Sequence, residues 1–264
     1  MGLNLKTLSQ VSGASSTLRS QQYLSKNVLK SIKPENIGYI CPDGTINFQS
    51  AKTAEEYAKN VVVKAARQKN PYEKSVVIDK NRITYERNGT RGNCPIELDK
   101  TGTWVHGHPD LYAKGGSFPF SATDYSSFCQ APGLDRAVVY NSLGEKAVMM
   151  KLPPKWGEKL LAKFLPQQSI IGAKIGACNG GYNAALIDKS AGKELNKLML
   201  KALWAKLTKN PEAAKMYTEQ NLNLYNKLLQ ESISEAGAKR LHEFWVKSAR
   251  RLGVDYSTNF SNLV

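Results

Sequence analysis

Two histidines that flank a single glycine constrain the fold of this chain more than any other feature. His106 and His108 are two of only three histidines in 264 residues. Alternate side chains of an extended strand point to the same face, so both imidazoles are expected to leave one face of a strand. Asp124 follows, with Ser121 three residues before it, which predicts a helix that opens at Ser121. The pattern therefore predicts a strand and a helix that meet at one site.

The residue types at this predicted site favour a metal. Catalytic zinc is commonly held by three nitrogen or oxygen ligands, with a fourth position left open. The neutral imidazoles of His106 and His108 with the carboxylate of Asp124 supply such a set. The sequence therefore predicts a Zn²⁺ site with these three ligands.

The run H-x-H-P at His106, followed by S-x-x-D at Ser121, resembles the JAMM (JAB/MPN) family of zinc metalloproteases and isopeptidases. The resemblance covers residues 51–154 and includes a strand, a helix and then a hairpin between Arg136 and Met150. It implies an α+β fold with a mixed β-sheet and flanking helices. It also implies zinc-dependent hydrolysis of a peptide or isopeptide bond, with ubiquitin-like conjugates as the favoured substrate class.

The resemblance also implies roles for two further residues. The family places a glutamate close to the strand that precedes the H-x-H strand, and here Glu73 precedes the apolar run Ser75–Asp79, which makes it the candidate general base. Glu86 and Glu97 are alternative candidates for that base. Ser121 is the candidate donor to the oxyanion that develops on the attacked carbonyl.

Patterning divides the chain into three parts. Residues 1–50 are expected to be a partly mobile N-terminal extension, and residues 51–154 the JAMM-like core, opened by a helix over 51–69. Residues 155–264 are expected to form a basic helical subdomain. Within it, apolar stripes and Asn210-Pro211 predict three helices. They are expected over residues 195–207, 211–232 and 234–252.

Charge and cysteine usage suggest partners and a compartment. The net charge is +15, and residues 151–264 carry eighteen basic and nine acidic side chains, so this part is expected to attract an anionic partner such as nucleic acid, acidic lipid or an acidic protein. No apolar run is long enough for a membrane span. The four cysteines lack a C-x-x-C pair, which favours a reducing, cytoplasmic compartment. The Ser- and Gln-rich residues 1–35 resemble the non-cleaved secretion signals of injected bacterial effectors or toxins.

The sequence also allows two alternatives to the zinc-hydrolase hypothesis. Cys178, in an Ile- and Gly-rich run, resembles the strand-end cysteine of caspase-like peptidases, in which His106 would serve as the base. The second alternative is a non-enzymatic basic module that binds an anionic partner.

Overall fold

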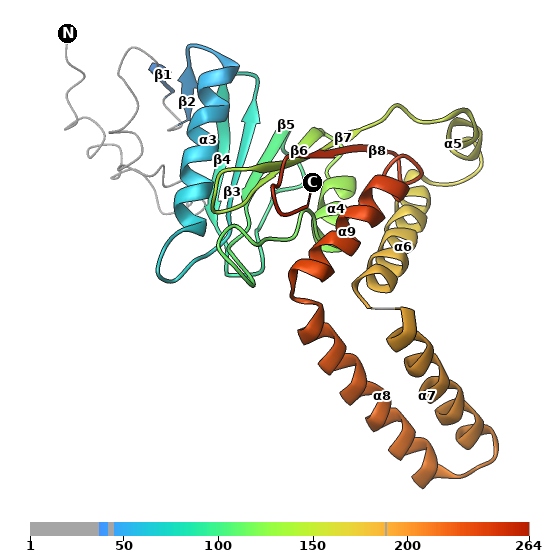
Figure 1. Cartoon of the computed structure of the whole chain (residues 1–264). Helices are drawn as coiled ribbons and strands as arrows, with labels where there is room; N and C mark the ends of the chain where they lie inside the picture. Colours follow the sequence, from blue (N-terminus) through green and yellow to red (C-terminus); the bar gives the residue numbers. More distant parts are fainter. Residues whose placement is uncertain (1–36, 42–44, 188, 264) are drawn as a thin grey trace, which may run out of the picture.

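The computed structural model describes residues 37–41, 45–187 and 189–263. The expectations for residues 1–35 lie outside this range. The elements follow the chain as β1 (Ile37–Ile40), β2 (Ile46–Phe48), α3 (Ala51–Ala66), β3 (Lys74–Asp79), β4 (Arg82–Asn88), β5 (Gly102–Gly107), α4 (Ala122–Gln130), β6 (Leu134–Tyr140), β7 (Lys146–Lys151), α5 (Trp156–Leu161), α6 (Gln167–Leu186), α7 (Lys189–Leu207), α8 (Pro211–Ser232), α9 (Glu235–Ser248) and β8 (Val254–Thr258). This mixture of helices and strands agrees with the predicted α+β class (Figure 1).

The strands form one mixed sheet. Its order is β1-β2-β4-β3-β5-β6-β7-β8. Strands β5 and β6 run parallel, whereas the other neighbouring strands described are antiparallel. Because a parallel pair needs a crossover connection, the chain leaves β5, passes through α4 and returns to β6. This crossover brings the start of α4 to the end of β5, and the expected hairpin between Arg136 and Met150 is confirmed as β6 and β7.

Helix α3 covers one face of the sheet. Ser50 caps its N-terminus by accepting a hydrogen bond from the backbone N–H of Thr53, and its Ala- and Val-rich face is buried. The core on this side joins α3 to side chains from β2–β6. The helix expected over residues 51–69 is therefore confirmed, with its end at Ala66.

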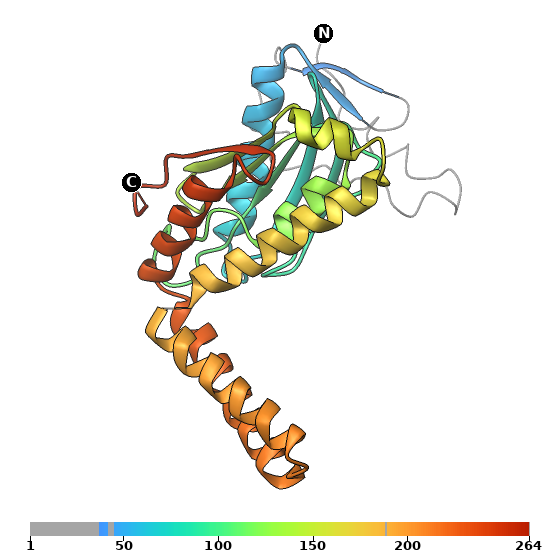
Figure 2. The same ribbon diagram turned by 90° about the vertical axis from the view of Figure 1, so that its right-hand side faces the viewer.

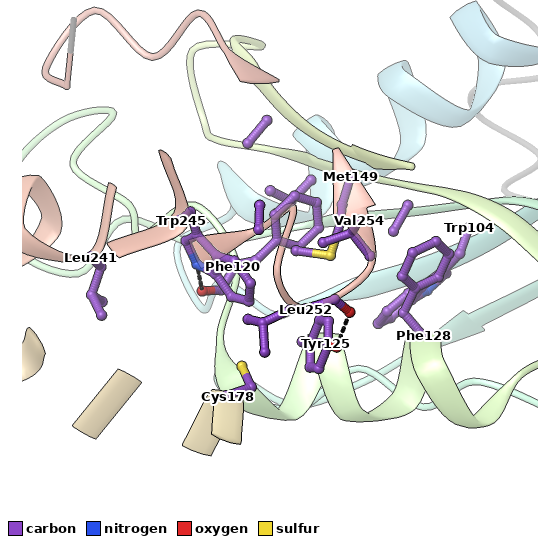
Figure 3. Packing of buried hydrophobic residues seen from close by; sticks show 14 of the residues in the cluster. Trp104, Phe120, Tyr125, Phe128, Met149, Cys178, Leu241, Trp245, Leu252 and Val254 are labelled. Atoms are coloured by element: carbon purple, nitrogen blue, oxygen red, sulfur yellow. Dashed lines mark hydrogen bonds between the residues drawn. The ribbon is translucent and has the colours of Figure 1, made fainter. Parts of the chain in front are cut away.

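Helices α4, α6 and α9 cover the opposite face (Figure 1). The core between them and the sheet is rich in aromatic side chains, and Figure 3 shows it from close by. Two hydrogen bonds cross it: Trp245 Nε1 donates to the carbonyl oxygen of Phe120 at 3.0 Å, and Tyr125 Oη donates to the carbonyl oxygen of Leu252 at 2.7 Å. The C-terminal part of the chain is thereby attached to both sides of the start of α4.

The sheet crosses both expected domain boundaries. Strands β1 and β2 lie before residue 51 and pair with the rest of the sheet through β4. Beyond residue 154, β8 pairs with β7, and α6 and α9 contribute buried residues to the same core as the sheet. The helices expected over 211–232 and 234–252 are confirmed as α8 and α9. After α9 the chain returns to the sheet, where β8 covers the edge of β7 that would otherwise be unpaired.

The helices α7 and α8 form an antiparallel pair that projects away from the sheet (Figures 1 and 2). Lys209 adopts a positive φ of 56° in the short connection, and Asn210 caps α8. Among the helices of the described residues, none combines the length and apolar character needed to cross a membrane.

Candidate metal centre

Strand β5 and the residue that follows it direct both histidines to the face of the sheet that α4 covers. His106 and His108 are buried, as the alternation of a strand predicts. Gly107 points to the other face, where a Cβ atom would lie 2.7 Å from the backbone oxygen of Val62 in α3. The glycine between the histidines is therefore required by the close approach of α3 to β5.

Helix α4 carries the acidic residue into the same space. Ser121 is the N-cap of α4 and forms a capping box with Asp124, as the S-x-x-D spacing predicts. Ser121 Oγ accepts from the Asp124 backbone N–H at 3.0 Å, while Asp124 Oδ2 accepts from the Ser121 backbone N–H at 2.7 Å. Asp124 Oδ2 also accepts from the Ser121 hydroxyl at 2.8 Å. The aspartate is thus held in one orientation by the first turn of its own helix.

The three predicted ligands lie together. His106 Nε2 is 3.4 Å from Asp124 Oδ1, and His108 Nε2 is 3.4 Å from Asp124 Oδ2. Both separations exceed a normal hydrogen bond, and they are made to different oxygens of the Asp124 carboxylate. One ligand atom from each residue lies within 4.8 Å of the others. This buried group could hold a metal ion.

Neighbouring groups fix the orientation of the two imidazoles. His108 Nδ1 lies 2.8 Å from the carbonyl oxygen of Phe118, so it donates there and leaves Nε2 as the ligand atom. The ring of His106 stacks on Trp104 with centroids 4.2 Å apart, and neither of its buried nitrogens has a hydrogen-bond partner in the described structure. A buried imidazole nitrogen without a hydrogen bond is costly, and a cation bound at Nε2 would satisfy that atom.

Burial and charge set the protonation of the cluster without metal. Burial lowers the pKa of His106, against the opposing effect of Asp124. Burial also acts to lower the pKa of His108, but its contacts with Asp124 and the charge of Glu73 outweigh this effect and raise the pKa to about 9. The two imidazoles overcome the burial of Asp124 and hold the pKa of its carboxyl well below the usual range. At neutral pH the metal-free cluster therefore pairs an imidazolium at His108 with a carboxylate at Asp124.

Glu73 lies next to this cluster. Ser75 pairs with His106 across the antiparallel strands β3 and β5, and continuing that register by two residues brings Glu73 opposite His108. Burial raises the pKa of Glu73 to about 7, with His108 acting to lower it and Asp124 to raise it. The backbone of Glu73 exchanges hydrogen bonds with the segment at Gly89 and Thr90. The backbone of Glu73 is therefore held next to the candidate ligands, and its carboxyl interacts electrostatically with His108 and Asp124.

The two alternative glutamates are used elsewhere. Glu86 faces α3, on the opposite side of the sheet from His106, where it accepts from Tyr57 Oη at 2.8 Å and pairs with Lys74 Nζ at 2.7 Å. Glu97 pairs with Lys100 at 2.9 Å in the segment before β5. The geometry of the described residues favours Glu73 as the carboxylate beside the cluster.

The segment between the histidines and α4 is a compact loop. Gly115 has a φ of +75°, and a Cβ atom there would lie 2.4 Å from Leu143 Cδ1, so the loop needs glycine at this turn. Ser117 Oγ donates to the carbonyl oxygen of Pro109 at 3.1 Å, and Asn141 Nδ2 donates to that of Gly115 at 3.1 Å. The loop thereby presents the Phe118 carbonyl to His108.

Cys178 is not at the end of a strand, so the strand-end position expected for it in the cysteine-peptidase hypothesis is wrong. It lies within helix α6 and is fully buried in the aromatic core (Figure 3). Burial raises the pKa of its thiol to about 12, which opposes formation of a thiolate nucleophile. Its run of small residues makes a helix that packs closely on α4 and α9.

Three contributors to the centre were not found from the sequence. They are the stacking ring of Trp104, the carbonyl of Phe118 and the indole of Trp245. The position of Trp104, two residues before His106 on the same face of a strand, is a signal that could have revealed it. The Phe118 carbonyl and the Trp245 indole are brought near by the fold, and no sequence spacing marks them.

Comparison with protein-family models, with curated proteins and with solved structures finds no match to this chain.

Proposed function

We propose that this protein is a zinc-dependent hydrolase of the JAMM type that cleaves a peptide or isopeptide bond. The observation that carries the proposal is the buried group of His106, His108 and Asp124 with Glu73 beside it. Two imidazole nitrogens and one carboxylate form a donor set used by catalytic zinc, with one position left for water or substrate.

Zinc in this site would polarise the scissile carbonyl and lower the pKa of water. Glu73 would take the proton from the attacking water and pass it to the leaving amine, so the bond to the amine breaks as the bond to the water oxygen forms. Without metal, burial raises the pKa of Glu73 to about 7, so its carboxyl can exchange a proton near neutral pH. The Ser121 hydroxyl donates to Asp124 in the resting arrangement, so a role at the oxyanion requires it to turn toward substrate.

Ubiquitin-like conjugates are the substrate class that the sequence resemblance favours, with an unmodified peptide or another protein as alternatives. The reaction class is the same for each, because the amide carbonyl and the leaving amine are common to all.

Metal analysis of the purified protein tests the ligand assignment. We expect about one zinc per chain, lost in His108→Ala and in Asp124→Ala, since each removes one of three protein ligands. His242→Ala is the matched control, because His242 lies on α9 and its Nδ1 is 3.1 Å from Tyr256 Oη, away from the cluster. Zinc retained in full by both cluster variants would overturn the proposal.

Cleavage assays test the base. Across a panel of ubiquitin-like conjugates and peptides, Glu73→Gln is expected to keep zinc and lose most activity, because the amide cannot accept a proton. Glu97→Gln should cleave normally. Cys178→Ser should also cleave normally when its activity is expressed per amount of folded protein. Full activity in Glu73→Gln would reject this assignment, and activity that survives zinc chelation but is lost in folded Cys178→Ser would favour the thiol mechanism.

A further inference from the structure

Helix α7 presents an apolar face to solvent. Ala202 and Ala205 are buried toward α8. On the rest of the helix, five large apolar side chains are exposed, and Trp204 and Leu207 each keep 68% of their accessible surface. We call these residues the α7 face: Met199, Leu200, Leu203, Trp204 and Leu207. At 100° per residue they span one continuous arc of the helix, directed away from α8.

Lysines border this face on both sides. Lys193, Lys197 and Lys201 follow one edge at four-residue steps, and Lys206 lies at the other edge. Glu194 is the one acidic residue in the sequence of α7. A hollow of about 650 Å³ continues from the α7 face toward α8, where Lys201 Nζ lies 5.4 Å from the ring centre of Tyr217. The helix is therefore amphipathic, exposed and strongly basic.

We propose that the α7 face binds the surface of a membrane that contains anionic lipids. Tryptophan and leucine side chains enter the boundary between headgroups and acyl chains, while lysines extend their ammonium groups to lipid phosphates. The broad apolar arc with lysines at its borders matches this chemistry. The helix would lie along the membrane surface, in keeping with the absence of a membrane-spanning helix among the described residues. This inference does not depend on the metal centre.

Two observations favour a membrane over other occupants. A second copy of this chain would bring two sets of border lysines together, and like charges would oppose that contact. The same pattern also recurs on α5 and the turn after it, where Trp156 and Phe164 are 78% and 77% exposed among Lys155, Lys159 and Lys163. Helices α5 and α7 both lie on the side of the molecule away from α3, which Figure 2 turns toward the viewer. A groove on a partner protein accommodates one helix, whereas a membrane accommodates both.

Flotation of the full chain with lipid vesicles tests the proposal. We expect binding to vesicles of phosphatidylcholine with phosphatidylserine, weakening as salt rises, and little binding to phosphatidylcholine alone. The double variant Lys193→Glu with Lys197→Glu should bind these vesicles at least about 30-fold more weakly than the unchanged protein. The double variant Trp204→Ser with Leu207→Ser should lose at least as much affinity.

Two control variants test whether vesicle binding requires the α7 face itself, and not merely positive charge or exposed apolar surface elsewhere on the protein. Lys227→Glu with Lys247→Glu changes two exposed lysines on α8 and α9, and Leu98→Ser with Val246→Ser changes two exposed apolar residues elsewhere. Both controls should bind as the unchanged protein does, and all variants should keep its circular dichroism. No binding to phosphatidylserine vesicles, or equal loss in controls and α7 variants, would overturn the proposal. So would a dimer in solution that the α7 variants convert to a monomer.

Discussion

The indole Nε1 of Trp245 donates a hydrogen bond of 3.0 Å to the carbonyl oxygen of Phe120, although 125 positions separate the two residues. Phe120 directly precedes Ser121, the N-cap of the helix that carries Asp124. Within the same helix, Tyr125 bonds to the backbone of Leu252. The end of the chain therefore supports the start of α4, so the geometry of the candidate metal centre depends on α9 as well as on the residues that would bind the metal.

Trp245→Phe is expected to weaken both the fold and metal binding. The variant keeps an aromatic ring but leaves the Phe120 carbonyl without its donor, which should cost about 1–3 kcal/mol of unfolding free energy. Metal affinity should fall because the Ser121 cap loses support. Tyr256→Phe is the control, since it removes the contact with His242 outside the centre. Denaturant unfolding and zinc competition measure the two effects, and unchanged affinity in Trp245→Phe would show that this bond serves stability alone.

Ser121→Ala tests the capping box at Asp124. Loss of the cap should destabilise the protein by about 1 kcal/mol, and loss of two contacts to Asp124 should lower metal affinity by about 10–100-fold. Ser50→Ala removes the corresponding cap of α3 and should destabilise the protein without lowering its metal affinity. Calorimetric titration with zinc compares the two. If Ser121→Ala binds zinc normally but cleaves poorly, the serine acts on the substrate and not on the ligand.

Metal binding should tighten as pH rises toward 9. The contacts with Asp124 and the charge of Glu73 outweigh burial and raise the pKa of His108 to about 9, so this imidazole carries a proton that must leave when metal binds. One displaced proton lowers the dissociation constant about tenfold for each pH unit below 9. Without metal, the raised pKa stabilises the fold fully below the ordinary pKa of histidine, and this stabilisation is lost as pH rises through about 9.

Calorimetry in buffers of different ionisation enthalpy measures that proton directly. Release of about one proton near pH 7.5 is expected, and the release should fall toward zero as the pH rises above about 9. Binding that is independent of pH between 6 and 9 would contradict the protonated state of His108.

Gly107→Ala is expected to destabilise the protein by about 1–3 kcal/mol, because the new methyl group would lie 2.7 Å from the Val62 backbone oxygen and must push α3 from β5. Gly92→Ala is the control, since a Cβ atom there meets nothing within 4 Å. Thermal unfolding of the two variants provides the test. Equal stability of both would mean that α3 can shift without cost.

The local elements of the centre were predictable from the sequence. Alternation placed His106 and His108 on one face of a strand, and the S-x-x-D spacing placed Ser121 and Asp124 in one helical turn. These features depend on residues close together in the chain, whose geometry is set by the period of a strand or a helix. The helix α3 and the hairpin of β6 and β7 were predictable for the same reason.

Tertiary structure decided the rest. Spacing in the sequence did not show which of three glutamates lies beside the histidines. The pairing of β3 with β5 brings Glu73 opposite His108, whereas Glu86 faces the other side of the sheet. Cys178 resembled a strand end, yet the packing of α6 on α4 and α9 makes that run a buried helix. The return of the chain to the sheet through β8 likewise has no local signal. Strand register and helix docking depend on which distant apolar faces bury one another, and that energy is a property of the whole chain, not of any short segment.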